Sequence, residues 1–403
     1  MLFSKHSDSM EEKRILLVNV VCGTGSTGRL CTDLVSIYEK HGYTVKIAYG
    51  RSRAPVEFSD RSVKIGNNMN ILWDVVLSRL FDNAGFNSYS ATKDFLRWVD
   101  NYNPDILHLH NLHGYYINVE LLFNYIRKKK KKIIWTMHDT WAFTGHSALC
   151  DGIGCEKWKV GCGQCPQLEE YPKAWKDNSY KNWIKKRAVF SNVENLTIVT
   201  PSKWLASCVN ESFLNNYIVK TIPNGINTSI FQPKKSELRK KYGIENKFII
   251  LGVASIWGSL KGYDDFVKID KMLEDGYQIV MIGSIKNVNT KRETNIININ
   301  HIENPNELAE WYSIADVFLN LSYCDTYPTV NIEAVACGTP VITYDVGGCV
   351  EAMHGYGMVV EKGNLNAVLE NIKKIRAKQW DRRVVDAYLD KESCLQKYCE
   401  LII

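Results

Sequence analysis

Residues 14–50 read RILLVNVVCGTGSTGRLCTDLVSIYEKHGYTVKIAYG and decide the fold. An apolar run at 14–20 is followed by the loop CGTGSTG at 22–28, by a stretch with helical periodicity and by a second apolar run at 44–50. Short apolar runs rich in Ile and Val indicate strands, so the order is strand, glycine loop, helix, strand. The stretch therefore predicts one βαβ unit with parallel strands.

The same alternation continues along the first half of the chain. The helical stretch DFLRWVDNYNP precedes the strand DILHLH at 105–110, and VELLFNYIRKKKKK precedes IIWTMHD at 133–139; LTIVTPS and IVKTIPNG are expected to close the sheet. Strands that are apolar almost throughout are typical of a parallel sheet covered by helices on both faces. We expect a doubly wound domain over residues 1–222, with a Cys-rich insertion at 146–172.

A polar run, INTSIFQPKKSELRKKYGIENK at 226–247, interrupts the pattern before apolar runs resume with FIILGVA at 248–254. These runs predict a second parallel α/β domain over 223–380. The helical stretch at 381–403 is expected to cross back to the first domain. Parallel sheets bind ligands beyond the carboxyl ends of their strands, so the chemistry is expected in the cleft between the domains.

Composition narrows the class of function. The 403 residues predict two domains of roughly 150 to 200 residues, and no apolar run approaches the roughly 18 residues that span a bilayer. The first fourteen residues, MLFSKHSDSMEEKR, lack the apolar stretch of a secretion signal, so we expect a cytoplasmic protein. The net charge of +6 is too small and too dispersed to indicate nucleic-acid binding.

The segment CDTYPTVNIEAVACGTPVITYDVGG at 324–348 carries the most chemical information. Its Pro328 suits the first turn of a helix. The free backbone amides of Thr329, Val330 and Asn331 at that helix start are suited to bind an anion such as phosphate.

Asp325 and Glu333 bracket this anion site. Carboxylates repel phosphate but accept hydrogen bonds from sugar hydroxyls, so the pair suits a sugar on either side of a diphosphate. The alternative is a solvated Asp and a Glu in a surface ion pair.

Two acids separated by seven residues, followed by ACGTPV at 336–341, resemble the signature of the retaining family-4 glycosyltransferases of GT-B fold. The resemblance covers most of the chain and implies two Rossmann-like domains that face a cleft. It also implies a nucleotide diphosphate sugar as donor, with Glu333 on the ribose hydroxyls and Asp325 on the transferred hexose. Asp325 departs from the usual Glu by one methylene, which puts its reach in question.

Lys261 stands in VASIWGSLKGYDDF at 253–266, just before Gly262 and the next helix. Its ammonium there is suited to stabilise a leaving diphosphate, although a lysine at a helix start is usually just solvated. The resembled family has a Lys-Gly pair at this place, with an Arg about five residues earlier. Ile256 occupies that position here, so Lys261 acts with the helix amides or with another basic residue.

The loop that contains Gly25 and Ser26 lacks the acidic residue that follows a dinucleotide fingerprint, so NAD binding is disfavoured. The resemblance implies that both residues approach the sugar or the diphosphate from the opposite wall. It also implies that His138, at the carboxyl end of a strand, contacts the hexose. His110 and His113 are expected on the acceptor side, where His110 could equally be a buried core residue.

Cys150, Cys155, Cys162 and Cys165 lie within sixteen residues and end in a C-x-x-C pair. Their spacing matches a structural zinc site with four thiolate ligands, with a redox pair or disulfides as the alternatives. Four protein ligands leave no open position on the metal, so we expect no catalytic role for it.

Residues 127–132 read RKKKKK at the end of a helical stretch. Cations complement the dipole of a helix end, so a solvated cap is one interpretation. The other is a patch for anionic lipid head groups, which suits a lipid-linked acceptor and places the protein at the inner face of the membrane.

The leading hypothesis is a retaining glycosyltransferase that moves a hexose from a nucleotide diphosphate sugar to a saccharide or lipid-linked acceptor in cell-envelope polysaccharide biosynthesis. No D-x-D pair lies near the predicted phosphate site, so a catalytic metal is not expected. The first alternative is a catalytically silent GT-B subunit that supports an active partner. A sugar-nucleotide epimerase of the same fold is the second.

Overall fold

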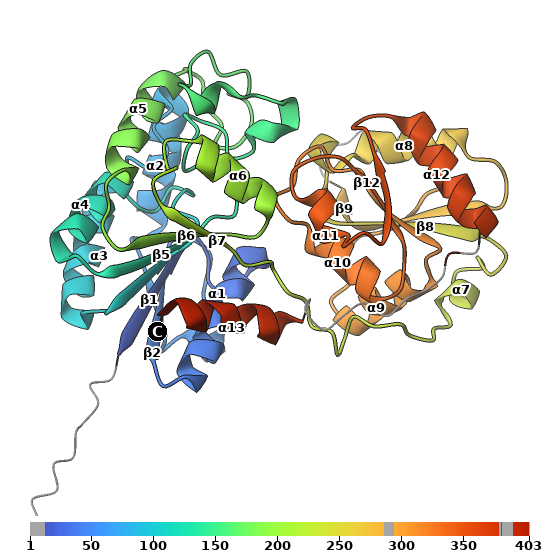
Figure 1. Ribbon diagram of the computed structural model, residues 1–403, viewed down its shortest axis with the longest axis horizontal. Helices are drawn as coiled ribbons and strands as arrows, with labels where there is room; N and C mark the ends of the chain where they lie inside the picture. Colours follow the sequence, from blue (N-terminus) through green and yellow to red (C-terminus); the bar gives the residue numbers. More distant parts are fainter. Residues whose placement is uncertain (1–12, 286–293, 379, 381–389, 403) are drawn as a thin grey trace, which may run out of the picture.

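The computed structural model describes residues 13–285, 294–378, 380 and 390–402. The chain forms two α/β domains, each built on one parallel sheet, as the sequence predicts (Figure 1). Residues 1–12, most of the fourteen residues in which a secretion signal was sought, lie outside the described residues. The expected start of the last helical stretch at 381 lies outside them too.

The N-terminal domain contains a seven-stranded sheet of order β3-β2-β1-β4-β5-β6-β7, in which every pairing is parallel. Leu17 of β1 pairs with Ile47 on one side and His108 on the other. The strands are β1 (Arg14–Asn19), β2 (Thr44–Tyr49), β3 (Ser62–Lys64), β4 (Ile106–Leu109), β5 (Lys132–Thr136), β6 (Leu196–Thr200) and β7 (Ile218–Thr221).

The helices of this domain begin where the sequence supplies caps and turn residues. The Asn118 side chain accepts from the Leu121 amide at 3.0 Å and starts α4, and Lys130 in the left-handed conformation ends it. The helices are α1 (Gly25–Lys40), α2 (Asn68–Phe81), α3 (Tyr89–Tyr102), α4 (Val119–Lys129), α5 (Ser179–Phe190) and α6 (Lys203–Glu211), with short 3₁₀ turns η1 (Val56–Phe58), η2 (Cys150–Ile153) and η3 (Lys157–Lys159).

The C-terminal domain contains a six-stranded sheet of order β10-β9-β8-β11-β12-β13, again with parallel pairings. Its strands are β8 (Phe248–Trp257), β9 (Tyr277–Ile285), β10 (Ile297–Ile299), β11 (Val317–Asn320), β12 (Val341–Tyr344) and β13 (Gly357–Val360). Its helices are α7 (Leu238–Lys241), α8 (Tyr263–Met272), α9 (Pro305–Ile314), α10 (Thr329–Ala336), α11 (Cys349–Ala352) and α12 (Leu365–Lys378), and η4 (Ser259–Lys261) precedes α8.

The last helix, α13 (Lys391–Ile402), returns to the N-terminal domain and lies beside α1 (Figure 1). Its buried Leu395, Tyr398 and Ile402 join the apolar cluster of β1 and α1. The Lys391 ammonium also pairs with Asp33 of α1 at 2.9 Å. The predicted return of the C-terminal helix is therefore confirmed.

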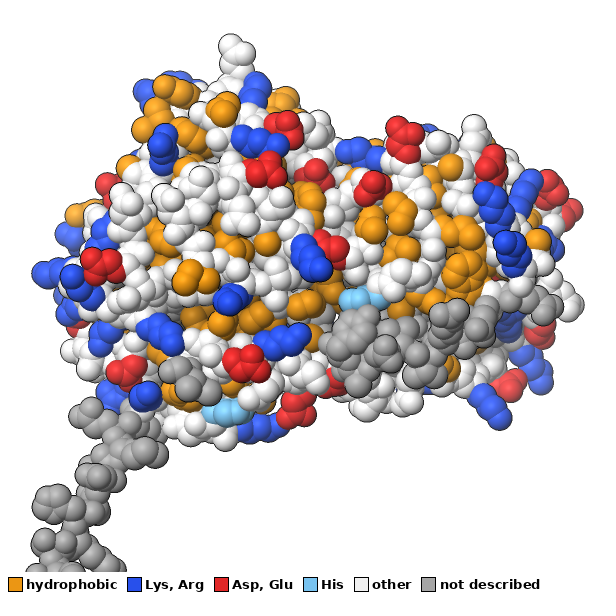
Figure 2. Space-filling view, in the orientation of Figure 1, with side chains coloured by type: hydrophobic (Ala, Val, Ile, Leu, Met, Phe, Trp, Pro, Cys, Tyr) orange, Lys and Arg blue, Asp and Glu red, His pale blue; other side chains and the backbone are white. Residues whose placement is uncertain are grey.

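Direct contacts hold the two domains together at a waist, where the outline of the molecule narrows between the lobes (Figure 2). The Thr326 hydroxyl donates to the His138 carbonyl at 2.9 Å. The Glu351 carboxylate accepts from the backbone amides of Lys203 and Trp204, the first residues of α6, at 2.8 and 2.7 Å. An acid at a helix start in the other domain fixes the relative position of the two sheets.

Candidate active site

A pocket of about 350 Å³ opens between the two domains. The starts of α1, α9 and α10 line it, together with the loop after β5, the linker 223–227 and α13. Ser26, His138, Thr329 and Glu333 are the predicted site residues that line this pocket, while Lys261 and Asp325 lie among the described residues outside its lining.

The pocket wall from the N-terminal domain is the start of α1. Gly25 is the first helical residue, and its φ of +65° is a backbone conformation that glycine adopts without strain. Thr24 makes no side-chain cap to this helix, and the first turn contains no acid. The first amides of α1 are thus left for an anion, beside the exposed Ser26.

The start of α10 differs in one respect from the expectation of three free amides. The Asn331 amide donates to the Pro328 carbonyl at 3.2 Å, and its buried side chain bonds Asn320 and the Cys349 carbonyl. Asn331 therefore fixes the turn, which leaves the amides of the half-buried Thr329 and Val330 as the expected anion ligands.

Glu333 lies one turn inside α10 and faces the pocket. Its Oε2 atom accepts from the Tyr312 hydroxyl at 2.9 Å. Burial raises the pKa of this carboxyl to about 7, against the opposing effects of the Tyr312 hydrogen bond and the positive charge of Arg29. In its ionised form this carboxyl only accepts, so it is suited to accept hydrogen bonds from a ligand's hydroxyls.

Lys261 and Asp325 form an ion pair, with 2.6 Å between Nζ and Oδ2. Lys261 ends η4, and Asp325 lies in the loop between β11 and α10. Burial lowers the pKa of Lys261, but the charge and hydrogen bond of Asp325 outweigh it and raise the pKa above its usual value. The structure thus keeps the lysine charged near the start of α10, with Asp325 as its partner.

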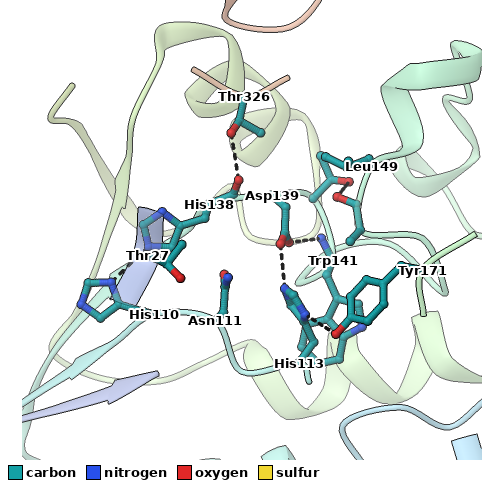
Figure 3. Close-up of polar contacts among 12 residues, drawn as sticks. Thr27, His110, Asn111, His113, His138, Asp139, Trp141, Leu149, Tyr171 and Thr326 are labelled. Carbon is teal, nitrogen blue, oxygen red and sulfur yellow. Dashed lines mark hydrogen bonds and ion pairs between the residues drawn. The ribbon is translucent and has the colours of Figure 1, made fainter. Parts of the chain in front are cut away.

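His138 follows β5, and its ring faces that of His110, the residue directly after β4 (Figure 3). The His110 Nδ1 atom lies 3.1 Å from His138 Nε2. Burial lowers the pKa of His138 to about 4 and holds that of His110 well below its usual value, so both rings are neutral at pH 7.

His113 belongs to a second polar group, which the sequence reasoning missed in part (Figure 3). Its Nε2 lies 2.7 Å from an Asp139 oxygen, and its Nδ1 lies 2.9 Å from the Tyr171 hydroxyl. Burial raises the pKa of Asp139, but the nearby His113 and the Trp141 amide outweigh it and lower the pKa. An ionised Asp139 only accepts, so in the neutral ring Nε2 carries the proton and Nδ1 accepts from Tyr171.

The sequence reasoning also missed pocket residues outside the recognised motifs. Arg29, one turn into α1, and Tyr398 of α13 both line the pocket. Arg29 directly follows the glycine loop at 22–28. A residue one turn inside a helix lies on the same face as the residues of its start, so the sequence could have predicted that Arg29 lies near the loop. It is a basic residue near Glu333, whereas Ile256 is half exposed in β8 and offers no charge.

The four clustered cysteines line one cavity of about 20 Å³, and all twelve cysteines of the chain are free thiols. Burial raises the pKa of Cys150 to about 12 and that of Cys162 to about 11. In the described part of the chain, no three His, Cys, Asp or Glu side chains are arranged to hold a metal ion. The geometry therefore gives no support to the predicted zinc site.

The basic run 127–132 finds partners within the domain. Arg127 donates to the Val189 carbonyl at the end of α5 at 2.5 Å, and Lys129 pairs with Asp100 at 2.6 Å. Figure 2 shows Lys and Arg side chains gathered at the end of the domain where α3 and α4 lie. These contacts are those expected of a cationic helix end.

Comparison with known proteins fits this geometry. The sequence model described as "Glycosyltransferase Family 4" matches residues 27–230, about half of the chain, and that described as "Glycosyl transferases group 1" matches 234–389. WcaC of Escherichia coli (strain K12), named as a colanic acid biosynthesis glycosyl transferase, is 25% identical over 342 residues, which cover 81% of this chain and 82% of WcaC.

Two further proteins bear on the fold and on the class of substrate. The N,N'-diacetylbacillosaminyl-diphospho-undecaprenol alpha-1,3-N-acetylgalactosaminyltransferase of Campylobacter jejuni is 28% identical over 146 residues, 34% of this chain and 38% of the relative. HepE from Anabaena, solved in complex with UDP, has the same fold with a TM-score of 0.64 at 11% identity, over 97% of this chain and 99% of HepE. No helix in the described ranges combines the length and apolarity needed to cross a bilayer. The chain belongs to the family-4 glycosyltransferases and has the GT-B fold.

Proposed function

We propose that this glycosyltransferase transfers a hexose, with retention of its anomeric configuration, from a nucleoside diphosphate sugar to a saccharide or lipid-linked acceptor in cell-envelope polysaccharide biosynthesis. The observation that carries the proposal is one pocket lined by both the uncapped start of α1 and the Glu333 carboxyl. A helix start attracts a diphosphate, and a carboxyl accepts from ribose hydroxyls. HepE in complex with UDP supports the class of donor, and the names of WcaC and the Campylobacter enzyme support the pathway and the acceptor.

The residue roles follow from position and charge. Glu333 binds the ribose, and the amides of Thr329 and Val330 hold the diphosphate with Lys261. Gly25 and Ser26 approach the same group from the other domain. Lys261 is held charged by Asp325 at 2.6 Å, so its ammonium is available to compensate the charge of the departing diphosphate.

The sugar itself lies between the domains, against His138 and Asp325. The acceptor oxygen bonds to the anomeric carbon on the face from which the nucleoside diphosphate leaves, and the acceptor's proton passes to the leaving phosphate oxygen. The helix starts and Lys261 stabilise the charge that develops, so the proposal requires no catalytic metal. His138 is neutral and positions a sugar hydroxyl through a hydrogen bond.

His110 and His113 contribute on the acceptor side. His110 orients His138, and the group of His113, Asp139 and Tyr171 shapes the wall beyond it. The absence of a membrane-spanning helix among the described residues accords with our proposal that the protein acts from the cytoplasmic side of the membrane.

A donor panel tests the function. UDP-, GDP-, ADP- and TDP-sugars are incubated with the protein and EDTA, and products are identified by mass spectrometry with and without acceptor. Release of free nucleoside diphosphate from at least one donor is expected. No turnover together with no nucleotide binding by calorimetry indicates the silent subunit instead, and an isomerised donor formed without acceptor indicates the epimerase.

The structural zinc at Cys150, Cys155, Cys162 and Cys165 stays a separate prediction, which no step above uses. Its support is the sequence spacing of the four cysteines. Metal analysis of protein purified with added zinc decides it. One zinc per chain that is lost in the Cys162→Ser variant supports the prediction, and a metal-free protein contradicts it.

A further inference from the structure

Helix α2 exposes apolar side chains and buries polar ones, which is the reverse of an ordinary surface helix. Five of its apolar residues, at positions i, i+3, i+4, i+7 and i+11, lie on the exposed face: Met69, Leu72, Trp73, Val76 and Leu80, of which Trp73 is 60% exposed. The buried residues of this helix are polar, Asp74 and Ser78. Folding by itself favours the opposite arrangement, with the apolar stripe against the core.

A hydrogen-bond network holds α2 in this orientation. The Ser78 hydroxyl and the Asn87 amide group donate to one oxygen of Asp74 at 3.0 and 3.1 Å, and the Ser88 hydroxyl donates to the other at 2.5 Å. Asp74 is 1% exposed, so a rotation of the helix would break its buried hydrogen bonds to Asn87 and Ser88, which lie outside α2. The outward direction of the apolar stripe is therefore fixed by the structure.

The exposed surface continues toward the acceptor side of the cleft. The Trp175 amide donates to the Arg79 carbonyl at the end of α2 at 2.8 Å, and its indole is 65% exposed. Tyr171, four residues earlier and 41% exposed, bonds His113 through its hydroxyl. We call the exposed stripe of α2 together with Trp175 the α2 surface.

Exposed cations lie at one end of the α2 surface and on the next helix, α3. Arg79 and Lys176 lie at the end beside Trp175, and Lys93 lies in α3, where its ammonium is 4.5 Å from the ring of Tyr89. These three basic residues are exposed and form no ion pair with any residue that the structure describes. Exposed Trp and Leu flanked by Lys and Arg are typical of a helix that lies in the interface of an anionic bilayer.

We propose that the α2 surface docks this glycosyltransferase on a membrane with anionic lipid head groups, with the acceptor side of the cleft facing the bilayer. The docking stands on the geometry of α2, whereas the identity of the acceptor side and the delivery of a lipid-linked acceptor from the bilayer rest on the proposed function. The basic run 127–132 has internal partners, so the proposal assigns the membrane contact to α2 in its place.

Vesicle binding by the full chain tests the docking. Wild-type protein is sedimented with vesicles of phosphatidylcholine alone and of phosphatidylcholine with phosphatidylglycerol. Binding to the anionic vesicles is expected, and it should weaken as salt is added. The double variant Leu72→Ser, Trp73→Ser removes two exposed apolar side chains, so its partitioning should fall about tenfold or more.

The matched control is the double variant Ile218→Ser, Val359→Ser, which removes exposed apolar side chains of β7 and β13 and should bind vesicles as wild type does. Circular dichroism melts establish that both variants are folded. Equal partitioning of the α2 variant and wild type overturns the proposal. So does a wild-type protein that ignores anionic vesicles but self-associates through α2 by sedimentation velocity, because the occupant is then a second copy.

Hydrolysis of the donor in solution separates this result from the proposed function. The α2 variant should release nucleoside diphosphate at the wild-type rate, since neither altered residue lines the pocket that contains Glu333. If vesicles bind and no donor is turned over, the docking holds while the proposed function fails.

Discussion

The Nδ1 atom of His110 lies 3.1 Å from Nε2 of His138, and 11° separates their ring planes. His110 is 1% exposed and its other ring nitrogen has no partner among the described residues, so its interaction with His138 is the polar contact that orients it. The pair links a buried residue that directly follows β4 to a residue of the pocket. His110 is thus placed to set which nitrogen of His138 carries the proton.

Replacing His110 tests this positioning. His110→Ala should lower kcat by about tenfold, because one net hydrogen bond of about 1 kcal/mol and the ring orientation are lost, while KM for the donor changes little. His110→Asn, which keeps a polar group near the former Nδ1, should regain much of the loss. Steady-state kinetics on both variants measure these changes in kcat and KM. Equal kcat for His110→Ala and wild type would show that His110 does not position His138 for the reaction.

The ion pair of Lys261 with Asp325 leads to a second prediction. Lys261→Met should lower kcat by about 10²-fold, because the ammonium that compensates the leaving diphosphate is gone. Lys268→Met is the matched control: its ammonium lies 3.2 Å from Asp265 on α8, and it should change kcat by less than about twofold. Similar kinetics in the two variants contradict the assignment of Lys261.

Helix α13 gives a prediction of stability. Tyr398 is 2% exposed, and its ring centre lies 5.5 Å from that of His108. Tyr398→Ala should lower the unfolding free energy of the N-terminal domain by about 3 kcal/mol, since a cavity forms between α13 and β4. Urea unfolding followed by tryptophan fluorescence measures it, with the exposed Lys397→Ala as control. An unchanged midpoint would show that α13 contributes little to this domain.

The pKa of Glu333, about 7, predicts a pH dependence of donor binding. The ionised carboxyl is the better acceptor of ribose hydroxyls, so a donor that needs it must displace a proton below that pKa. The affinity for UDP-glucose or GDP-mannose, whichever binds, should fall up to about tenfold per pH unit below 7 and level off above it. Glu333→Gln should lose this dependence. An equally steep profile in that variant assigns the titration to another group.

Much of the fold is predictable because it rests on local patterns. Apolar runs such as 14–20 form strands wherever both sheet faces are covered, and the turn residues around Pro328 fix the start of α10. The sequence motifs also predict Glu333, Thr329, Ser26 and His138, which line the pocket. Each of them lies just after a strand or within about a turn of a helix start, where the direction of the side chain follows from the element.

The remaining features depend on contacts between distant segments. The Tyr171 hydroxyl bonds His113 because the irregular segment after His138 folds back over His113. No sequence periodicity predicts this contact. Most residues of helix α2 are apolar, so its sequence does not show which face is buried. Its buried face is decided by Asn87 and Ser88, which supply the partners of Asp74. Hydrogen bonds to residues outside the helix, rather than the helical period of its apolar residues, therefore decide which face of α2 is exposed.

The role of Glu333 is tested most directly by calorimetry of nucleoside diphosphates. Wild type and Glu333→Gln are titrated with UDP, GDP and ADP at pH 8, where the carboxyl is ionised. Loss of a charge-assisted hydrogen bond worth about 1.5–3 kcal/mol should weaken binding of the preferred nucleotide about tenfold to a hundredfold. Equal affinities in the two proteins, or no binding to wild type, would contradict the donor site between the domains.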